Sequence, residues 1–174
     1  MKAMKKVLVS ALAAALVVTA AAPAGAAPSP VKAPKAINGK ATVKGVTVKT
    51  SKKGTATVTA VKSKKATVKV AATIKVKGVT YKVTAIGANA FKNCKKVKKI
   101  SVGKNVKTIG KNAFKGCKKL KTITLANKKV TIKKGAFAGL NTKKITVKAP
   151  KMSKKELKKF KKALKKAGFK GKVK

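Results

Sequence analysis

Residues 84–102 read TAIGANAFKNCKKVKKISV, and a close copy, KTIGKNAFKGCKKLKTITL, follows at residues 107–125. The two copies begin 23 residues apart. A third, more divergent copy begins at Ile132, contains GAFAGL at residues 135–140 and closes at Ile145 and Val147, one residue short of that period. A period in the twenties with apolar residues at fixed places is typical of a solenoid, in which successive coils stack.

Four apolar columns run through the three copies and predict one continuous core. We expect each coil to contribute a short strand (100–102, 123–125 and 145–147) and a turn or short helix around its Ala-Phe pair. The columns are Ile86/Ile109/Ile132, Phe91/Phe114/Phe137, Cys94/Cys117/Leu140 and Ile100/Ile123/Ile145.

The shared pattern, I-G-x-x-A-F-x-x-C-x-x-L-x-x-I-x-[IVL], resembles the BspA-type leucine-rich repeat of secreted and surface proteins of bacteria. The resemblance extends from Val83 to about Val147. The flanking segments are similar to those of small Lys-rich members from Gram-positive gut bacteria. The resemblance implies a non-enzymatic extracellular adhesion or interaction module, and it carries over no catalytic residue.

The segments that precede the repeats predict export and an extended linker. Three early lysines, the uncharged run 7–22 and the small residues 24–26 form a signal peptide pattern over residues 1–26. The rival interpretation is a retained membrane anchor, but the run of 16 residues is shorter than the about 20 that span a bilayer. Residues 27–40 hold three prolines among small residues and indicate a linker. We therefore expect a secreted or extracellular protein, with association with the cell wall as a further possibility.

Two further segments complete the predicted α+β, mostly β fold. Residues 41–83 alternate β-branched and polar side chains between short breaks, which predicts a β-hairpin or meander cap with one solvated face. The repeats then occupy residues 84–149 in about three 23-residue coils.

Residues 150–174 form a capping helix and tail, in which Ser153 and Glu156 make a capping box and Met152 and Leu157 a hydrophobic staple. One helix face carries Leu157, Phe160, Ala163, Leu164 and Ala167, and Gly168 and Phe169 predict a Schellman ending.

The composition excludes most kinds of catalysis. The 174 residues include 48 basic ones, all lysine, and a single acidic side chain, Glu156, for a net charge of +47. Histidine, arginine and aspartate are absent from the sequence, so Ser-His-Asp triads, paired carboxylates and imidazole or carboxylate metal sites cannot form. We predict no catalytic residue, cofactor or metal. Glu156 is most simply explained as a helix cap.

The two cysteines have two interpretations. Cys94 and Cys117 hold the same repeat position, so stacking should bring them side by side. They could form a disulfide between coils in an oxidising compartment. They could equally remain buried thiols, which behave as small hydrophobic side chains. Leu140 in the same column of the third copy favours buried thiols.

Lysines also stack on lysines. The candidate polyanion-binding pairs are Lys92/Lys115, Lys95/Lys118, Lys96/Lys119 and Lys98/Lys121. Strand spacing would put each pair roughly 5 Å apart, with no acidic neighbour to offset the repulsion. This favours anionic polymers such as teichoic acid, anionic glycans or extracellular DNA, or a host surface protein, as partners, although lysines chosen only for solubility would give the same pattern. No arginine forks or exposed aromatic series are present to read bases, so nucleic-acid binding would be non-specific. The pattern predicts no particular oligomeric state.

The alternative function is a cationic membrane-active protein. Residues 153–167 would then act as a basic amphipathic helix on anionic lipid. The staple and the Schellman contact instead indicate that this helix covers the end of the solenoid, as terminal units of repeat proteins do.

Overall fold

The computed structural model describes residues 35–92 and 94–174. The described residues belong to one compact unit. The predicted signal peptide and residues 27–34 of the predicted linker lie outside the described residues. In the described part of the chain, no helix is both long and apolar enough to cross a membrane.

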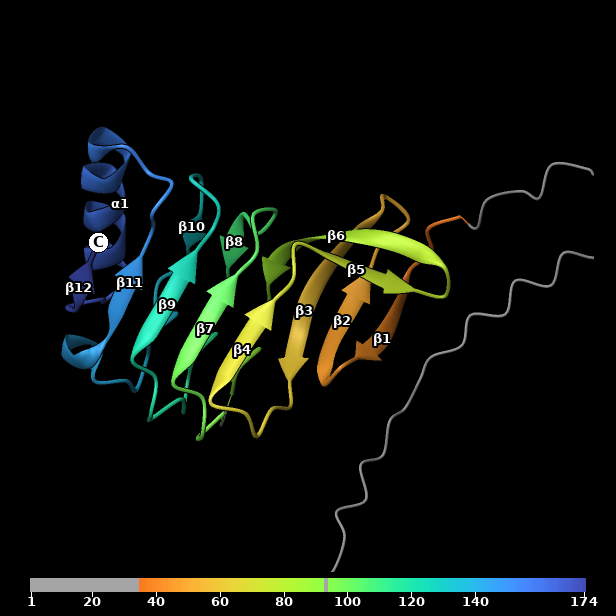
Figure 1. The fold of residues 1–174 in the computed structure, drawn as a ribbon, viewed down its shortest axis with the longest axis horizontal. Helices are drawn as coiled ribbons and strands as arrows, with labels where there is room; N and C mark the ends of the chain where they lie inside the picture. Colours follow the sequence, from red (N-terminus) through yellow and green to blue (C-terminus); the bar gives the residue numbers. More distant parts are fainter. Residues whose placement is uncertain (1–34, 93) are drawn as a thin grey trace, which may run out of the picture. The chain divides into compact units, whose positions relative to one another are not determined.

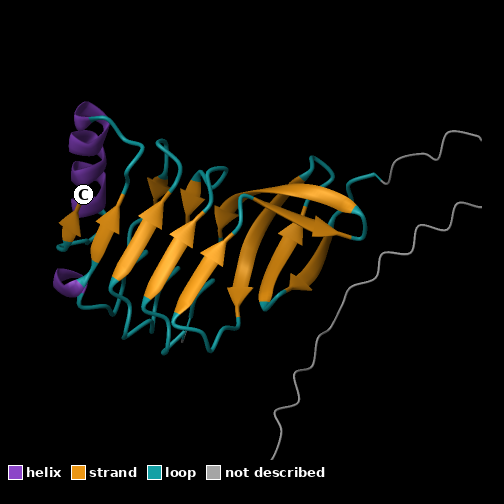
Figure 2. Ribbon diagram, in the orientation of Figure 1, coloured by secondary structure: helices purple, strands orange, loops and turns teal. Residues whose placement is uncertain are grey.

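Two sheets face each other across the core (Figure 1). The long sheet has the order β1-β2-β3-β6-β8-β10, with β5 paired to β6, and the parallel sheet has the order β12-β11-β9-β7-β4. The strands of the long sheet are β1 (Gly39–Val43), β2 (Val46–Thr50), β3 (Thr55–Val61), β5 (Thr73–Val76), β6 (Val79–Ile86), β8 (Thr108–Ile109) and β10 (Thr131–Ile132). Those of the parallel sheet are β4 (Thr67–Val70), β7 (Lys99–Val102), β9 (Thr122–Leu125), β11 (Thr146–Lys148) and β12 (Lys172–Val173). The mostly β, repeat-like architecture with one α-helix is as predicted (Figure 2).

The repeat columns meet in the core. Ile109 pairs in register with Ile86 on one side and with Ile132 on the other. The Phe114 ring lies 5.5 Å from the Phe91 ring and 5.5 Å from the Phe137 ring, centroid to centroid. The Phe column is therefore core, as the repeat pattern predicted.

The third copy departs from the predicted register. Val147, rather than Ile145, pairs with Ile123. The short 3-10 helix Thr142–Lys144 precedes this strand and takes up extra chain, so the coil is one residue longer than the period rather than one shorter. Ile145 stays buried just before the strand begins.

The predicted meander over residues 41–83 is wrong as a single continuous element. β1, β2 and β3 are antiparallel neighbours, and β5 and β6 form a second hairpin. β4, however, lies in the other sheet and pairs in parallel with β7, while β3 pairs in parallel with β6. The buried side chains Val68 and Val70 of β4 thus extend the rows of Ile100 and Val102 by one more strand.

The C-terminal helix α1 (Lys154–Lys166) is placed by the predicted local signals. The Ser153 side chain accepts from the Glu156 backbone, and the Glu156 carboxylate accepts from the Ser153 backbone, which completes the capping box. At the other end, Phe169 N–H donates to Leu164 O, as in a Schellman motif. The Phe169 ring packs 5.0 Å from that of Phe137 and so extends the Phe column. Phe160, Leu164 and Ala167 are buried, but Ala163, predicted on the same face, is exposed.

Removal of the cap should weaken the protein in a pH-dependent manner. We expect Ser153→Ala to lower the free energy of unfolding by about 1 kcal/mol at pH 7, as is usual for an N-cap serine. Hydrogen bonds from the Ser153 backbone and hydroxyl lower the pKa of Glu156, so the carboxylate stabilises the fold above its ordinary pKa and this contribution is lost as the pH falls through the lowered value. Denaturant melts of both proteins between pH 7 and pH 2 measure the difference. A gap that stays constant over that range would contradict the assignment of Glu156 to the cap.

Candidate functional site

The turns that follow β6 and β8 set the geometry of the candidate site. Asn89 and Asn112 adopt the left-handed backbone conformation with φ of 57° and 55°, and Gly135 takes the same place in the third copy with φ of 75°. Asparagine and glycine are the residues that tolerate this conformation. The turns also bond to one another, since Phe91 N–H donates to Ala113 O at 2.8 Å. Successive turns are therefore stacked in register.

Close packing between turns requires glycine at Gly110. A β-carbon there would lie 2.7 Å from the Ala88 backbone nitrogen of the preceding coil. No side chain fits at that distance without displacing backbone. Gly110→Ala is expected to destabilise the protein by about 1–3 kcal/mol, the usual cost of overpacking a rigid site, and a denaturant melt measures it. A parent-like midpoint would contradict the stacked-turn geometry.

Lysines line the edge formed by these turns. All eight predicted polyanion-binding lysines are exposed. Lys98 and Lys121 are direct neighbours, because Lys121 N–H donates to Lys98 O at 2.8 Å. In Figure 1 the turns that lead into β4, β7, β9 and β11 follow one another along the lower edge of the molecule. The predicted pairs thus occupy equivalent places in adjacent coils.

The edge is longer than the repeat pattern indicated. The turn before β4 carries three more exposed lysines, and the 3-10 helix before β11 carries two. The repeat pattern does not indicate these residues, because the coil that contains β4 lacks the Ala-Phe motif and the third copy is out of period. We call the following exposed residues the lysine edge: Lys62, Lys64, Lys65, Lys92, Lys95, Lys96, Lys98, Lys115, Lys118, Lys119, Lys121, Lys143 and Lys144.

The lysine edge has no acidic neighbour. The only carboxylate side chain of the protein, Glu156, is bonded to Ser153 at the start of α1. The lysines that act on the Glu156 carboxylate are Lys128 and Lys129, which do not belong to the edge. Like charges on adjacent coils repel.

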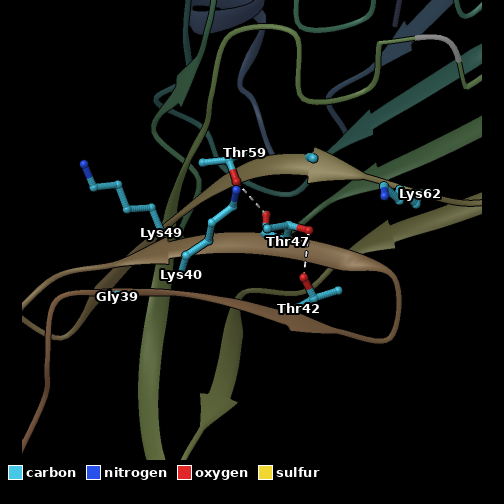
Figure 3. Close-up of a pocket in the computed structure, with 8 residues that line it drawn as sticks. Gly39, Lys40, Thr42, Thr47, Lys49, Thr59 and Lys62 are labelled. Atoms are coloured by element: carbon cyan, nitrogen blue, oxygen red, sulfur yellow. Dashed lines mark hydrogen bonds between the residues drawn. The ribbon is translucent and has the colours of Figure 1, made fainter.

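A second basic surface lies on the outer face of β1, β2 and β3 (Figure 3). A hollow of about 710 Å³ is lined there by lysines and threonines. Lys40 and Lys49 are directly opposite each other on β1 and β2, and the hydroxyls of Thr42 and Thr47 are 2.9 Å apart. A register shift at Thr47 bends this part of the sheet. No motif in the sequence predicted a role for this face.

The two cysteines are buried free thiols. Cys94 Sγ donates to Val61 O and Cys117 Sγ to Phe91 O, each over 3.2 Å. The interaction with Cys117 lowers the pKa of Cys94 to about 7, and the interaction with Cys94 raises the pKa of Cys117. The thiols are thus neighbours, and a disulfide between them is the less favoured of the two interpretations given by the sequence.

Replacement of both thiols should leave the fold intact. We expect the Cys94→Ala, Cys117→Ala protein to melt cooperatively, with a loss of about 1 kcal/mol per position, because each thiol supplies one weak hydrogen bond. Circular dichroism melts with and without reductant test this expectation. Complete loss of structure under reducing conditions would instead show that a disulfide between the coils holds the fold together.

No three His, Cys, Asp or Glu side chains cluster among the described residues as a metal site would require. The two thiols donate to backbone carbonyls inside the core. The exposed groups that recur at equivalent places on adjacent coils are lysine ammonium groups.

Comparison with known proteins points to one family. The model of the BspA type leucine-rich repeat region (6 copies) matches residues 80–174. A leucine-rich repeat protein from Bacteroides capillosus has a crystal structure with 25% identity and a TM-score of 0.57, covering 66% of this chain and 88% of that one. A leucine-rich cell surface protein from Faecalibacterium prausnitzii gives 24% identity and a TM-score of 0.54, covering 64% of this chain and 37% of that one. No curated protein matches this chain.

Proposed function

Because the chain belongs to the BspA-type leucine-rich repeat family, we propose that it is a non-enzymatic interaction module at the cell surface or outside the cell, and that its lysine edge binds polyanions. The observation that carries the proposal is the register of the edge, where exposed lysines repeat on stacked coils with no carboxylate nearby. The similarity to a bacterial cell surface protein supports the location.

A line of ammonium groups suits a polymer better than a small anion. Adjacent coils are separated by roughly 4.8 Å, so a linear chain of phosphates, sulfates or carboxylates lying along the edge would meet a lysine at every coil. Lysine binds phosphate as a point charge and imposes no geometry on the ligand. The proposal therefore covers teichoic acids, anionic glycans and DNA, bound by their charge alone.

A pair of variants with equal charge tests the site. The edge variant carries glutamine at Lys95, Lys96, Lys118 and Lys119, and the matched control carries glutamine at four exposed helix lysines, Lys155, Lys158, Lys159 and Lys162. Binding of heparin and of a duplex DNA is measured by titration at two salt concentrations. We expect the edge variant to lose at least tenfold more affinity than the control. Equal losses would show that the charge acts diffusely and would overturn the edge as the site.

The membrane-active alternative is not favoured by the packing of α1. Phe160 and Leu164, which a membrane-bound helix would insert, are buried in the protein core. The helix would have to leave the end of the solenoid first. We therefore expect no leakage from anionic vesicles at concentrations where heparin binding is saturated.

A further inference from the structure

The two sheets end at different places at the N-terminal end of the solenoid. β4 is the last strand of the parallel sheet, whereas the long sheet continues past β3 with β2 and β1. Figure 1 shows β4 as the outermost arrow of its row, with β3, β2 and β1 beyond it. Within residues 35–92 and 94–174, no strand pairs with the outer edge of β4.

The register of β4 shows which backbone groups are free. In the pairing with β7, Ala66 O accepts from Lys99 N–H and Val70 O accepts from Gly103 N–H. Along a parallel strand, the residues whose backbone groups bond to a given neighbour alternate. The backbone N–H and C=O groups of the even-numbered residues of β4 therefore point towards β7. The N–H and C=O groups of Lys69 and Ala71 therefore point away from β7, towards the outer edge.

An apolar groove of about 370 Å³ lies beside this edge. Its volume falls within the about 300–1,000 Å³ of ligand sites. We call it the β4 groove. Val48, Val58, Val70 and Val83 form a floor that is at most 2% exposed. Half-buried Val43, Val46 and Ile74 form its walls. The groove thus lies where the inward side chains of one more strand of the parallel sheet would pack.

The rim of the β4 groove is basic. Lys44, Lys69 and Lys75 line it and are all exposed. A second copy of this chain would bring its own lysines against them, so two β4 edges would repel. The complementary occupant has alternating apolar and acidic side chains, because a strand sends successive side chains to opposite faces.

We propose that the outer edge of β4 and the β4 groove bind an extended acidic segment of a partner protein by β-strand addition. The segment pairs with the free groups of Lys69 and Ala71 and places its apolar side chains over the valine floor. Its carboxylates lie beside the three rim lysines. Main-chain bonds supply the affinity and the groove the side-chain preference. This inference goes beyond polyanion binding at the lysine edge, uses none of its residues, and can fail or succeed independently of it.

The probe is a blocked heptapeptide of alternating glutamate and valine. Two matched peptides accompany it: one with N-methyl groups on alternate backbone nitrogens, which keeps charge and hydrophobicity but cannot pair, and one with lysine in place of glutamate. Fluorescence anisotropy with the full chain measures binding at low and moderate salt. We expect the acidic peptide to bind at least tenfold more tightly than either matched peptide and to keep measurable affinity at moderate salt.

Two substitutions at one position separate charge from pairing. Lys69→Gln removes a rim charge, and Lys69→Pro also removes the outward N–H while leaving the bonds from β4 to β7 in place. We expect the proline protein to bind the acidic peptide at least tenfold more weakly than the glutamine protein. The edge variant described above should bind it as the parent does. If the proline protein does not melt cooperatively, the parent protein is used instead. NMR then measures whether the peptide protects the backbone amides of Lys69 and Ala71 from hydrogen exchange.

Three results would overturn strand addition. They are equal binding of the N-methylated peptide, equal binding by the proline and glutamine proteins, and unchanged amides at Lys69 and Ala71. If the acidic peptide binds but loses its affinity in the edge variant, the contact is simply electrostatic and belongs to the lysine edge. Failure of the acidic peptide to bind while heparin still binds would reject this inference and leave the proposed function standing.

Discussion

Phe114→Ala is expected to lower the free energy of unfolding by about 3–5 kcal/mol, the range for a buried phenylalanine. The Phe114 side chain is 0% exposed and lies between two other rings of its column, each 5.5 Å away. Its removal leaves a cavity and breaks both aromatic contacts, each worth about 0.5–1.5 kcal/mol beyond the area buried. Domains of this size are stable by only about 5–15 kcal/mol, so the variant should lose a large part of that stability and melt at a clearly lower temperature than the parent.

Thermal and denaturant melts measure this effect. Lys115→Ala is the matched control, because Lys115 is the next residue in the same turn and its side chain is exposed. The control should melt within a few degrees of the parent. A cooperative melt of Phe114→Ala near the parent temperature would contradict the repeat core.

Added salt is expected to raise the melting temperature, and polyanions should raise it further at low salt. The folded protein holds a net charge of +47, with lysines aligned on adjacent coils and one carboxylate in the chain. The screening length falls to about 8 Å at physiological ionic strength, and this weakens the repulsion between lysines on neighbouring coils. A ligand that prefers the folded array shifts the unfolding equilibrium, although the unfolded polycation binds anions too and reduces the gain.

A melt series across salt, with and without heparin, tests the electrostatic account. Binding to duplex DNA should weaken with salt with a log–log slope near −0.9 per phosphate neutralised and should show no base preference. The lysine edge variant should show a smaller salt effect than the helix control variant. A flat melt series, or a clear preference between two DNA sequences, would point to a shaped site in place of a charged edge.

The short-range features of the fold were predictable because their partners are close in sequence or recur at one spacing. The capping box joins Ser153 to a residue three positions away, and the Schellman ending joins Phe169 to Leu164. The Phe and Ile columns were visible because the same apolar side chain returns at each period, as stacked coils require. The exposed lysines of the two regular copies followed from the same spacing.

The start of the solenoid could not be predicted in this way. Val68 pairs with Ile100, but the β5–β6 hairpin lies between them and lengthens the first coil beyond the period. Alternation of apolar residues marks β4 as a strand and does not say which sheet receives it. The lysines before β4 and the β4 groove were missed for that reason.

The sequence by itself determined the repeat, the apolar columns, the helix cap and the excess of positive charge, since each depends on residue type and local spacing. Only the tertiary structure decided the register of the last coil, where Ile145 and Val147 are both apolar and alternation permits either to face Ile123. It also decided that the parallel sheet stops at β4 while the long sheet continues. Both outcomes depend on pairing between parallel strands. Such strands are joined by long connections, so the contacts that decide the pairing are distant in sequence.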